Sequence, residues 1–344
     1  MNLADHTTIG LGGPAKNFVW AGTETDVITA VRAADARGEP VLILGGGSNL
    51  VVADEGFPGT VVQVATRGFG VENGLVTVAA GEDWDAVVAR TVGCGLAGLE
   101  CLSGIPGLAG ATPIQNVGAY GQEVAQTICQ VRAYDRGTEK ILDIPNEQCD
   151  FGYRTSKFRG AGAFVVLSVT FSLAVQALSV PVRYAELATA LGVGVGDQVP
   201  GPRARAAVIE LRRRKGMVID PADPDTRSVG SFFVNPVLDV GALAAVEAAA
   251  RARCGPQVQV PRFGAGDGLV KVPAAWLIER AGFGKGYHGG DGARISAKHT
   301  LALVNSGSAS TDGLMALARE IRDGVRDAFG VSLAPEPVLV GVAL

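Results

Sequence analysis

The sequence predicts an α+β protein built from two or three domains, and three observations support this prediction. A chain of 344 residues exceeds the usual size of a single hydrophobic core. Segments with helical apolar spacing occur among short apolar runs that are typical of strands. Two glycine-rich loops, residues 45–49 and 105–121, are separated by such strands. This arrangement favours two small lobes that hold one large ligand between them.

In the first hundred residues, apolar residues recur at helical spacing over residues 24–37 and from Trp84 to Gly93. The expected strands cover residues 40–44, 60–64 and 75–80. The run GGGSN at 45–49 follows the first strand directly. Its consecutive backbone N–H groups can form a concave anion-binding nest, although a plain glycine-rich connection has the same sequence.

Neither common nucleotide-binding fingerprint fits. After Gly45 and Gly47, a Rossmann motif needs a third glycine where Leu50 stands. It also needs an acidic residue about 20 positions later, where Arg67 and Gly68 stand. The segment at 284–286 lacks the upstream glycine and the following hydroxyl residue of a Walker loop. The loop at 45–49 is therefore expected to bind phosphate in another way.

The long segment 105–121 is too rich in glycine for a regular element and predicts an ordered loop. Backbone can approach a flat ligand closely at five positions, which are Pro106, Gly107, Gly110, Gly118 and Gly121. Polar side chains for hydrogen bonding are Thr112, Gln115 and Asn116. The alternative is an Ω-type loop that packs on itself.

The rest of the chain alternates between both element types. Strands are expected at 127–134, 139–144, 163–173, 300–305 and 338–344. Helices are expected at 204–215, 239–251, 273–281 and 311–329. The turn-rich segment 221–227 is the most plausible domain boundary.

Composition narrows the class of protein. The formal net charge of −4 argues against a nucleic-acid partner, and 48 glycines are about twice the usual share. Five cysteines without a CxxC pair indicate neither a disulfide framework nor a zinc site. The N-terminus has no signal-peptide pattern, and no apolar run reaches transmembrane length. We therefore expect a cytoplasmic protein that binds no metal, nucleic acid or membrane. We also expect a monomer, although nothing in the composition determines the oligomeric state.

Six motifs occur in order, and together they resemble one family. They are HTTIGLGGPA at 6–15, GGGSN at 45–49, IPGLAGATPIQNVGAYG at 105–121, FGYRTSKF at 151–158, GSFFVNP at 230–236 and PEP at 335–337. The set resembles the UDP-N-acetylenolpyruvoylglucosamine reductases over nearly the whole chain. The resemblance implies a two-lobed FAD-binding domain of the vanillyl-alcohol-oxidase type and a C-terminal α+β substrate-binding domain.

The resemblance also implies domain boundaries. The first FAD-binding lobe is expected at residues 1–66 and is completed by the C-terminal segment 333–344. The second lobe is expected at 67–217 and the substrate-binding domain at 218–332. The segment PVRYAEL at 181–187 resembles the Tyr-bearing substrate loop of one subgroup of the family.

The implied reaction is the NADPH-dependent reduction of UDP-N-acetylglucosamine enolpyruvate to UDP-N-acetylmuramate through noncovalent FAD. By resemblance, Arg154 stabilises the developing enolate, Ser231 donates the proton and Glu336 assists its delivery. The expected FAD-binding residues are Gly45, Gly46, Gly47, Ser48, Asn49, Gly107, Ala111, Thr112, Gln115, Asn116, Gly118 and Gly121.

For the UDP moiety, the resemblance points to Tyr184, Lys215 and Asn235. Asn235 precedes a proline, so it can equally be a turn residue. We interpret the arginines at 212–214 as a solvated helix face. His288, in a glycine-rich segment, is only a weak candidate for the substrate site.

Two alternatives stay open from the sequence. One is an FAD-dependent alcohol oxidase of the same fold class. Many such enzymes attach flavin through His or Cys, and no His lies in the two cofactor loops. The other is a non-catalytic protein that binds flavin or a nucleotide sugar. The combination of Arg154, Ser231 and Glu336 argues against it.

Overall fold

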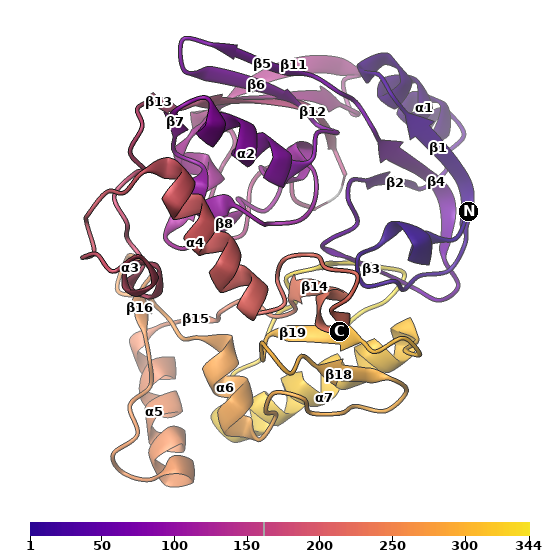
Figure 1. Cartoon of the computed structure of the whole chain (residues 1–344). Helices are drawn as coiled ribbons and strands as arrows, with labels where there is room; N and C mark the ends of the chain where they lie inside the picture. The colour runs from indigo at the N-terminus through magenta and orange to yellow at the C-terminus, as the bar shows by residue number, and fades with distance from the viewer. Residues whose placement is uncertain (161) are drawn as a thin grey trace. The chain divides into compact units, whose positions relative to one another are not determined.

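The computed structural model describes residues 1–160 and 162–344, which form two compact units (Figure 1). The first unit contains Met1, Ala15–Gly47 and Phe57–Val218. The second contains Asn2–Pro14, Ser48–Gly56 and Ile219–Leu344. Each unit combines helices with sheets, as expected for an α+β protein.

The first unit contains a small parallel sheet with one covering helix. Its strands run in the order β1-β4-β2, with the bounds Ala15–Ala21, Phe57–Val64 and Val41–Leu44. Helix α1, Glu24–Ala36, begins with a capping box between Thr23 and Asp26. It buries Val27 and Val31 in a core shared with the sheet. The sequence predicted α1, β2 and most of β4 but missed β1, where the polar residues Lys16 and Asn17 interrupt the apolar pattern.

A five-stranded antiparallel sheet forms the larger part of the first unit. Its order is β11-β10-β12-β6-β5, with the bounds Lys140–Pro145, Ile128–Asp135, Phe164–Ser172, Leu75–Ala79 and Phe69–Glu72. Helix α2, Trp84–Gly93, shares a core with this sheet. The fully buried Trp84 contacts Phe171 at a ring distance of 5.6 Å. Tyr134 of β10 and Val165 and Leu167 of β12 belong to the core of the small parallel sheet, so the two sheets share part of their hydrophobic packing.

Two further helices complete the first unit. Helix α3, Ala185–Leu191, packs against α4, Gly201–Arg214. The segment 181–187 was expected to be a loop, but α3 begins within it, because Leu187, Ala188 and Leu191 bury one face in the α4 core. Two short strand pairs are β7 (Leu96–Ala97) with β13 (Ala174–Val175), and β8 (Gly118–Ala119) with β9 (Gln122–Glu123).

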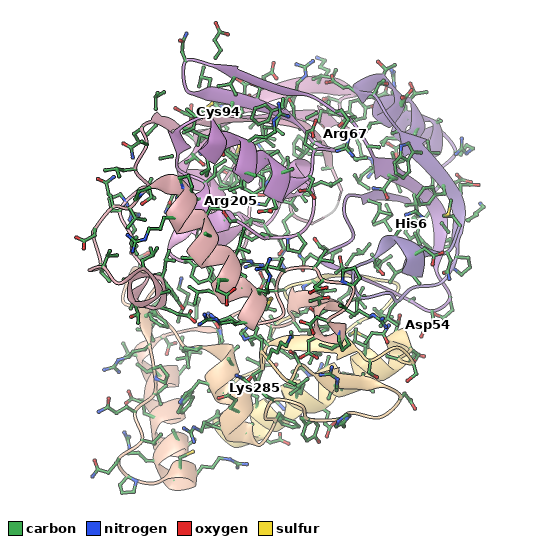
Figure 2. The ribbon with its side chains drawn as sticks, in the orientation of Figure 1. His6, Asp54, Arg67, Cys94, Arg205 and Lys285 are labelled. Carbon is green, nitrogen blue, oxygen red and sulfur yellow. The ribbon has the colours of Figure 1, made fainter. Side chains whose placement is uncertain are left out.

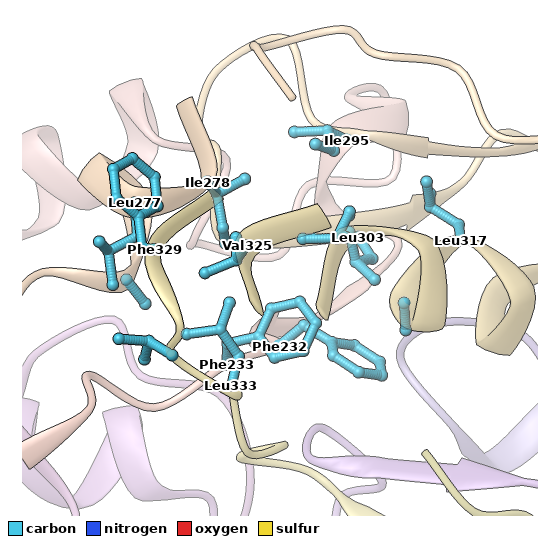
Figure 3. Packing of buried hydrophobic residues seen from close by; sticks show 14 of the residues in the cluster. Phe232, Phe233, Leu277, Ile278, Ile295, Leu303, Leu317, Val325, Phe329 and Leu333 are labelled. Carbon is cyan, nitrogen blue, oxygen red and sulfur yellow. The ribbon is translucent and has the colours of Figure 1, made fainter. Parts of the chain in front are cut away.

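The second unit packs small sheets against three helices. Its strands are β3 (Leu50–Val52), β14 (Ser228–Ser231), β15 (Val237–Leu238), β16 (Phe263–Gly264), β17 (Val270–Lys271), β18 (Ala293–Ile295), β19 (Ala302–Asn305) and β20 (Val338–Val340). Its helices are α5 (Val240–Cys254), α6 (Ala274–Ala281) and α7 (Thr311–Phe329). The strands pair in the orders β14-β19-β18, β15-β17-β16 and β20-β3. Figure 3 shows the core, where Phe232 and Phe233 pack with residues of α6 and α7.

Short 3-10 turns connect these elements at Leu3–His6, Glu100–Leu102, Ala109–Ala111, Val124–Gln126, Asn146–Gln148 and Pro224–Thr226. The C-terminal strand is shorter than expected, because Gly341 adopts a positive φ of 73° directly after Val340. Strand β20 pairs in parallel with β3. The domain boundaries expected from the sequence stay a prediction.

Candidate active site

The two glycine-rich loops lie against each other in the first unit. A side chain at Gly46 would place its Cβ 2.9 Å from the Cα of Gly107. Gly45 lies next to Leu108, and its carbonyl accepts a hydrogen bond of 2.8 Å from Gln63 Nε2. Only glycine allows this approach of two backbones. The structure therefore brings together the first parts of the two expected cofactor loops.

Backbone hydrogen bonds fix the start of the second loop. The amide of Ala109 donates to Glu82 O at 2.9 Å, and the amide of Trp84 donates to Gly107 O at 3.0 Å. At Gly110, a Cβ would collide with the side chain of Ala80. Thr112 is buried, and its hydroxyl donates to Ala109 O at 2.8 Å. The loop is thus held on the connection between β6 and α2.

Asn116 ties the middle of the loop to its surroundings. Its Nδ2 donates to Gly152 O at 3.0 Å and to Glu123 Oε2 at 3.1 Å, while its Oδ1 accepts from Ala125 N. Asn116 has a φ of 43°, and Tyr120 in the same loop has a φ of 49°. Such left-handed backbone costs about 1–3 kcal/mol per residue, and it clusters at functional sites. The assignment of Asn116 to the cofactor stays a prediction.

Arg154 lies against this loop. Its Nη2 donates to Gly118 O at 2.9 Å, and its Nη1 donates to Asn116 O at 3.4 Å. Its φ of 54° is again in the left-handed region. Arg159 Nη1 donates to the Arg154 carbonyl at 2.6 Å and supports this conformation. The structure therefore positions the Arg154 guanidinium on the backbone of the expected cofactor loop.

The other expected FAD-binding residues fall into two groups, one in each unit, and the first group comprises Gly47, Ala111, Gln115 and Gly121. Gln115 is buried, Ala111 is exposed, and the φ values of Gly47 and Gly121 are 63° and 83°. Ser48 and Asn49 belong to the second unit, where Asn49 O accepts a hydrogen bond of 3.0 Å from Val338 N.

Ser231 and Glu336 come together in the second unit. Ser231 ends β14, where it pairs with Ala302 of β19. The amide of Glu336 donates to Phe232 O at 2.8 Å, directly after Ser231 in the chain. A bridge between Phe233 and Pro335 continues this pairing. Because Phe232 and Phe233 are buried, the motifs GSFFVNP and PEP are held side by side by the core.

Tyr184 and Lys215 meet around a third residue, Tyr120. The rings of Tyr120 and Tyr184 make an edge-to-face contact at 5.6 Å, and Lys215 Nζ lies 5.6 Å from the Tyr120 ring centre. Lys215 Nζ also donates to Glu186 Oε2 at 2.7 Å. Burial raises the pKa of Tyr120 to about 12, so its hydroxyl stays neutral at physiological pH. Sequence reasoning missed Tyr120, although an aromatic residue between Ala119 and Gly121 in a cofactor loop was a usable signal.

A cavity of about 270 Å³ opens beside this cluster. Its lining residues include Cys101, Tyr120, Gln122, Val180, Pro181 and Arg183. The segment that carries Tyr184 thus borders an open space.

The interpretation of the arginines at 212–214 as a solvated face is wrong for Arg212. This side chain is half-buried and lies next to Gly104, and its Nη2 donates to Met217 O at 3.0 Å. Its buried Nε has no hydrogen-bond partner among the described residues. Burial lowers the pKa of Arg212 to about 10, and nearby Tyr120 and Asp85 act in the opposite direction. The helical spacing rotates Arg212 toward the core, whereas the two following arginines pair with Glu210 at the surface.

Arg205, labelled in Figure 2, lies on α4 seven residues before Arg212. Its guanidinium donates two hydrogen bonds, of 2.6 and 2.7 Å, to the carboxylate of Asp85. The same carboxylate accepts from Gly104 N at 2.5 Å. Helix α4 is therefore joined to α2 and to the start of the second cofactor loop.

The remaining candidates have ordinary surroundings. Asn235 Oδ1 accepts a hydrogen bond of 2.9 Å from Ala274 N at the start of α6, and its assignment to the substrate stays a prediction. His288 is exposed. Among the residues that the structure describes, no three His, Cys, Asp or Glu side chains gather as a metal site. Within the same ranges, no helix is both long and apolar enough to cross a membrane.

The loops around Gly46 and Gly107 fit a large flat cofactor with a diphosphate. Backbone replaces side chains where the loops meet, and the buried polar residues Thr112 and Gln115 lie in the same loop. Exposed N–H groups of such loops suit phosphate oxygens.

Two family profiles match the chain. The profile described as "UDP-N-acetylenolpyruvoylglucosamine reductase, C-terminal domain" matches residues 220–340, and the one described as "FAD binding domain" matches residues 15–144. A UDP-N-acetylenolpyruvoylglucosamine reductase of Streptomyces avermitilis is 57% identical over 99% of this chain and 94% of that protein. Its counterpart in Thermobifida fusca is 54% identical over 99% of this chain and 97% of that protein.

A solved structure is also similar. The crystal structure of UDP-N-acetylenolpyruvylglucosamine reductase from Thermus caldophilus has a TM-score of 0.68 and 25% sequence identity. The match covers 99% of this chain and 97% of that chain. Together with the family profiles, it confirms the expected fold class, an FAD-binding domain of the vanillyl-alcohol-oxidase type followed by a C-terminal α+β domain.

Proposed function

Because this chain belongs to the UDP-N-acetylenolpyruvoylglucosamine reductase family, we propose that Arg154, Ser231 and Glu336 carry out its reaction. The enzyme is an FAD-dependent oxidoreductase. It uses NADPH to reduce UDP-N-acetylglucosamine enolpyruvate to UDP-N-acetylmuramate in peptidoglycan precursor synthesis. The observation that carries the residue assignment is the contact of the Arg154 guanidinium with the cofactor loop at Gly118.

Bound FAD would supply the hydride-transfer chemistry between NADPH and the enolpyruvyl substrate. The residues that would hold it are the backbone of Gly45 to Gly47, the loop from Gly107 to Gly121, and the side chains of Thr112 and Gln115. No His lies in either loop, which supports noncovalent binding.

Arg154 stabilises the negative charge that develops on the substrate. When hydride reaches the β-carbon, charge builds on the α-carbon and spreads into the neighbouring carboxylate. A guanidinium stays charged throughout and can bind a carboxylate through two parallel hydrogen bonds. Because backbone carbonyls already orient Arg154, little reorganisation is needed when this charge appears.

Ser231 donates the proton that completes the reduction at the α-carbon. A hydroxyl is a weak acid, so it needs a strongly basic acceptor and a partner that helps to replace its proton. The backbone hydrogen bond from Glu336 N to Phe232 O holds Glu336 beside the residue that follows Ser231, which supports a role for its carboxylate as that partner. The prolines at 335 and 337 restrict the backbone on both sides of Glu336.

Substrate recognition involves Tyr184 and Lys215 at the diphosphate, together with Asn235. The cluster around Tyr120 supports a joint role for the first two residues. The enzyme acts as a cytoplasmic monomer. Its first FAD-binding lobe comprises residues 1–66 and 333–344, its second lobe residues 67–217, and its substrate-binding domain residues 218–332.

The test starts with the purified protein. We expect a flavin absorption band, and acid precipitation should release the yellow colour into the supernatant. NADPH should be consumed only when UDP-N-acetylglucosamine enolpyruvate is added. A yellow pellet together with oxidation of simple alcohols would instead identify an oxidase with covalent flavin. A colourless protein that does not take up FAD would contradict the proposal.

A further inference from the structure

The lysine expected to bind the substrate diphosphate already has an anionic partner. Lys215 follows the last turn of α4, and its Nζ donates to the carboxylate of Glu186 at 2.7 Å. Glu186 lies in the first turn of α3, two residues after Tyr184. The side chains of Lys215 and Glu186 are 32% and 40% exposed, so solvent and ligands reach the pair.

The aromatic contacts of Lys215 limit where its ammonium group can go. Nζ lies 5.6 Å from the centre of the Tyr120 ring, and Tyr184 meets the same ring edge-on. A lysine has a long flexible chain, and fixing it costs side-chain entropy. Tyr120 and Glu186 together hold Lys215 in one region beside Tyr184.

We propose that Glu186 is a counter-ion that occupies Lys215 in the free enzyme and is replaced by the diphosphate of the substrate. This inference rests on the proposed function, which assigns Lys215 to the diphosphate. Glu186 is then a positioning residue that sets the anion selectivity of the site.

Charge explains why replacement is possible. An exposed ion pair is weak, because solvent screens both partners. A diphosphate carries more negative charge than a carboxylate and offers more acceptor oxygens to an ammonium group with three donors. A diphosphate can therefore displace Glu186, whereas a weaker anion competes poorly. While it remains nearby, the Glu186 carboxylate also repels any incoming anion.

The test compares affinities of the FAD-loaded enzyme for UDP and for uridine, measured by isothermal titration calorimetry. In Glu186→Gln, we expect UDP to bind about three to ten times more tightly, because a competing charge is lost. Uridine carries no phosphate, so its affinity should change by less than about twofold. The matched control is Glu210→Gln, which removes the same charge from a carboxylate that pairs with Arg213 and Arg214. It should leave both affinities unchanged.

Three results would overturn the inference. They are unchanged or weaker UDP binding in Glu186→Gln, an equal gain for UDP and uridine, or the same gain in the Glu210→Gln control. The flavin spectrum of each variant verifies that it is folded and loaded.

A second variant separates this inference from the proposed function. In Lys215→Met, UDP should bind at least about ten times more weakly, and adding Glu186→Gln should then bring a smaller gain. If Lys215→Met leaves UDP affinity unchanged, the assignment of Lys215 itself fails. If Lys215→Met weakens binding but Glu186→Gln has no effect, only the counter-ion role fails.

Discussion

The two units hold their candidate catalytic residues by different means. In the first unit, Arg154 is part of an irregular segment with left-handed backbone, and carbonyls of the loop 105–121 orient its guanidinium. In the second unit, Ser231 ends a regular strand, and Glu336 is held by backbone pairing beside it. The candidate residues thus fall into a loop-built half in the first unit and a strand-built half in the second.

This difference indicates which changes each half tolerates. The loop-built half depends on glycines that admit close backbone contacts, as at Gly46 and Gly107. The strand-built half depends on the buried pair Phe232 and Phe233, which anchors both motifs in the core. We therefore expect small backbone changes to disturb cofactor binding in the first unit. Changes to the Ser231 and Glu336 side chains, which leave this buried pair in place, should keep the fold intact and alter only the chemistry.

Ser231→Ala tests the strand-built half with the largest expected effect. Reduction of the enolpyruvyl substrate should slow about 10³-fold, because proton donation by a positioned group contributes roughly 10²–10⁴-fold. Flavin reduction by NADPH should remain normal, since it needs no proton from Ser231. Anaerobic rapid-mixing absorbance separates the two half-reactions. Equal loss of both would indicate a folding defect instead.

Arg154→Lys tests the loop-built half. We expect kcat to fall about 100-fold, because a lysine cannot reproduce a bidentate contact with a carboxylate. The flavin content should stay the same as in the wild type. Steady-state kinetics compare this variant with the control Arg213→Lys, which changes a surface arginine on α4. Turnover near the wild-type rate would remove Arg154 from the site.

Glu336→Gln keeps the side-chain shape and removes its charge. We expect about a tenfold lower rate of enolpyruvyl reduction, since Glu336 assists Ser231 rather than donating the proton. The thermal midpoint should change little, because the Glu336 backbone amide, which pairs with Phe232, is retained. An unchanged rate in single-turnover experiments would exclude a catalytic role.

Gly46→Ala addresses the contact between the loops. The added methyl group would lie 2.9 Å from Gly107 Cα, so the loops must separate, and FAD affinity should fall about tenfold. Gly93→Ala is the matched control, because a Cβ there meets no atom within 4 Å. Titration of the apoprotein with FAD, followed by flavin fluorescence, measures both. Equal affinities in the two variants would contradict the proposed role of the Gly46–Gly107 contact.

The prediction with the smallest expected effect concerns the rates at which the cysteine thiols react. Burial raises the pKa of Cys101 to about 12, so this thiol stays protonated and unreactive at pH 8 and ionises only as the pH approaches 12. The exposed Cys94 and Cys254 should react rapidly with a disulfide reagent at that pH. Peptide mapping after timed labelling identifies each site. Fast labelling of Cys101 would mean that its surroundings, next to the second cofactor loop, are open.

Sequence patterns predicted the long elements well, because helices α1, α2 and α7 and strands β10 and β12 have clear apolar periods. They failed where contacts with the rest of the protein determine the secondary structure. Strand β1 carries polar and exposed residues, and α3 is stabilised by packing on α4 rather than by a long pattern. Motifs indicated Arg154, Ser231 and Glu336 as candidates, but not the backbone carbonyls that orient Arg154. Arg212 was misjudged because charge alone does not show which face of a helix is buried.

A double-mutant cycle can show whether Arg154 and Ser231, one from each half, act in the same chemical step. Single-turnover reduction of the enolpyruvyl substrate would be measured for Arg154→Lys, Ser231→Ala and the double variant. If both residues serve one step, their effects should be strongly non-additive, with the double variant only slightly slower than the slower single variant. Losses that multiply fully would show that the two residues act independently and would rule out a shared step.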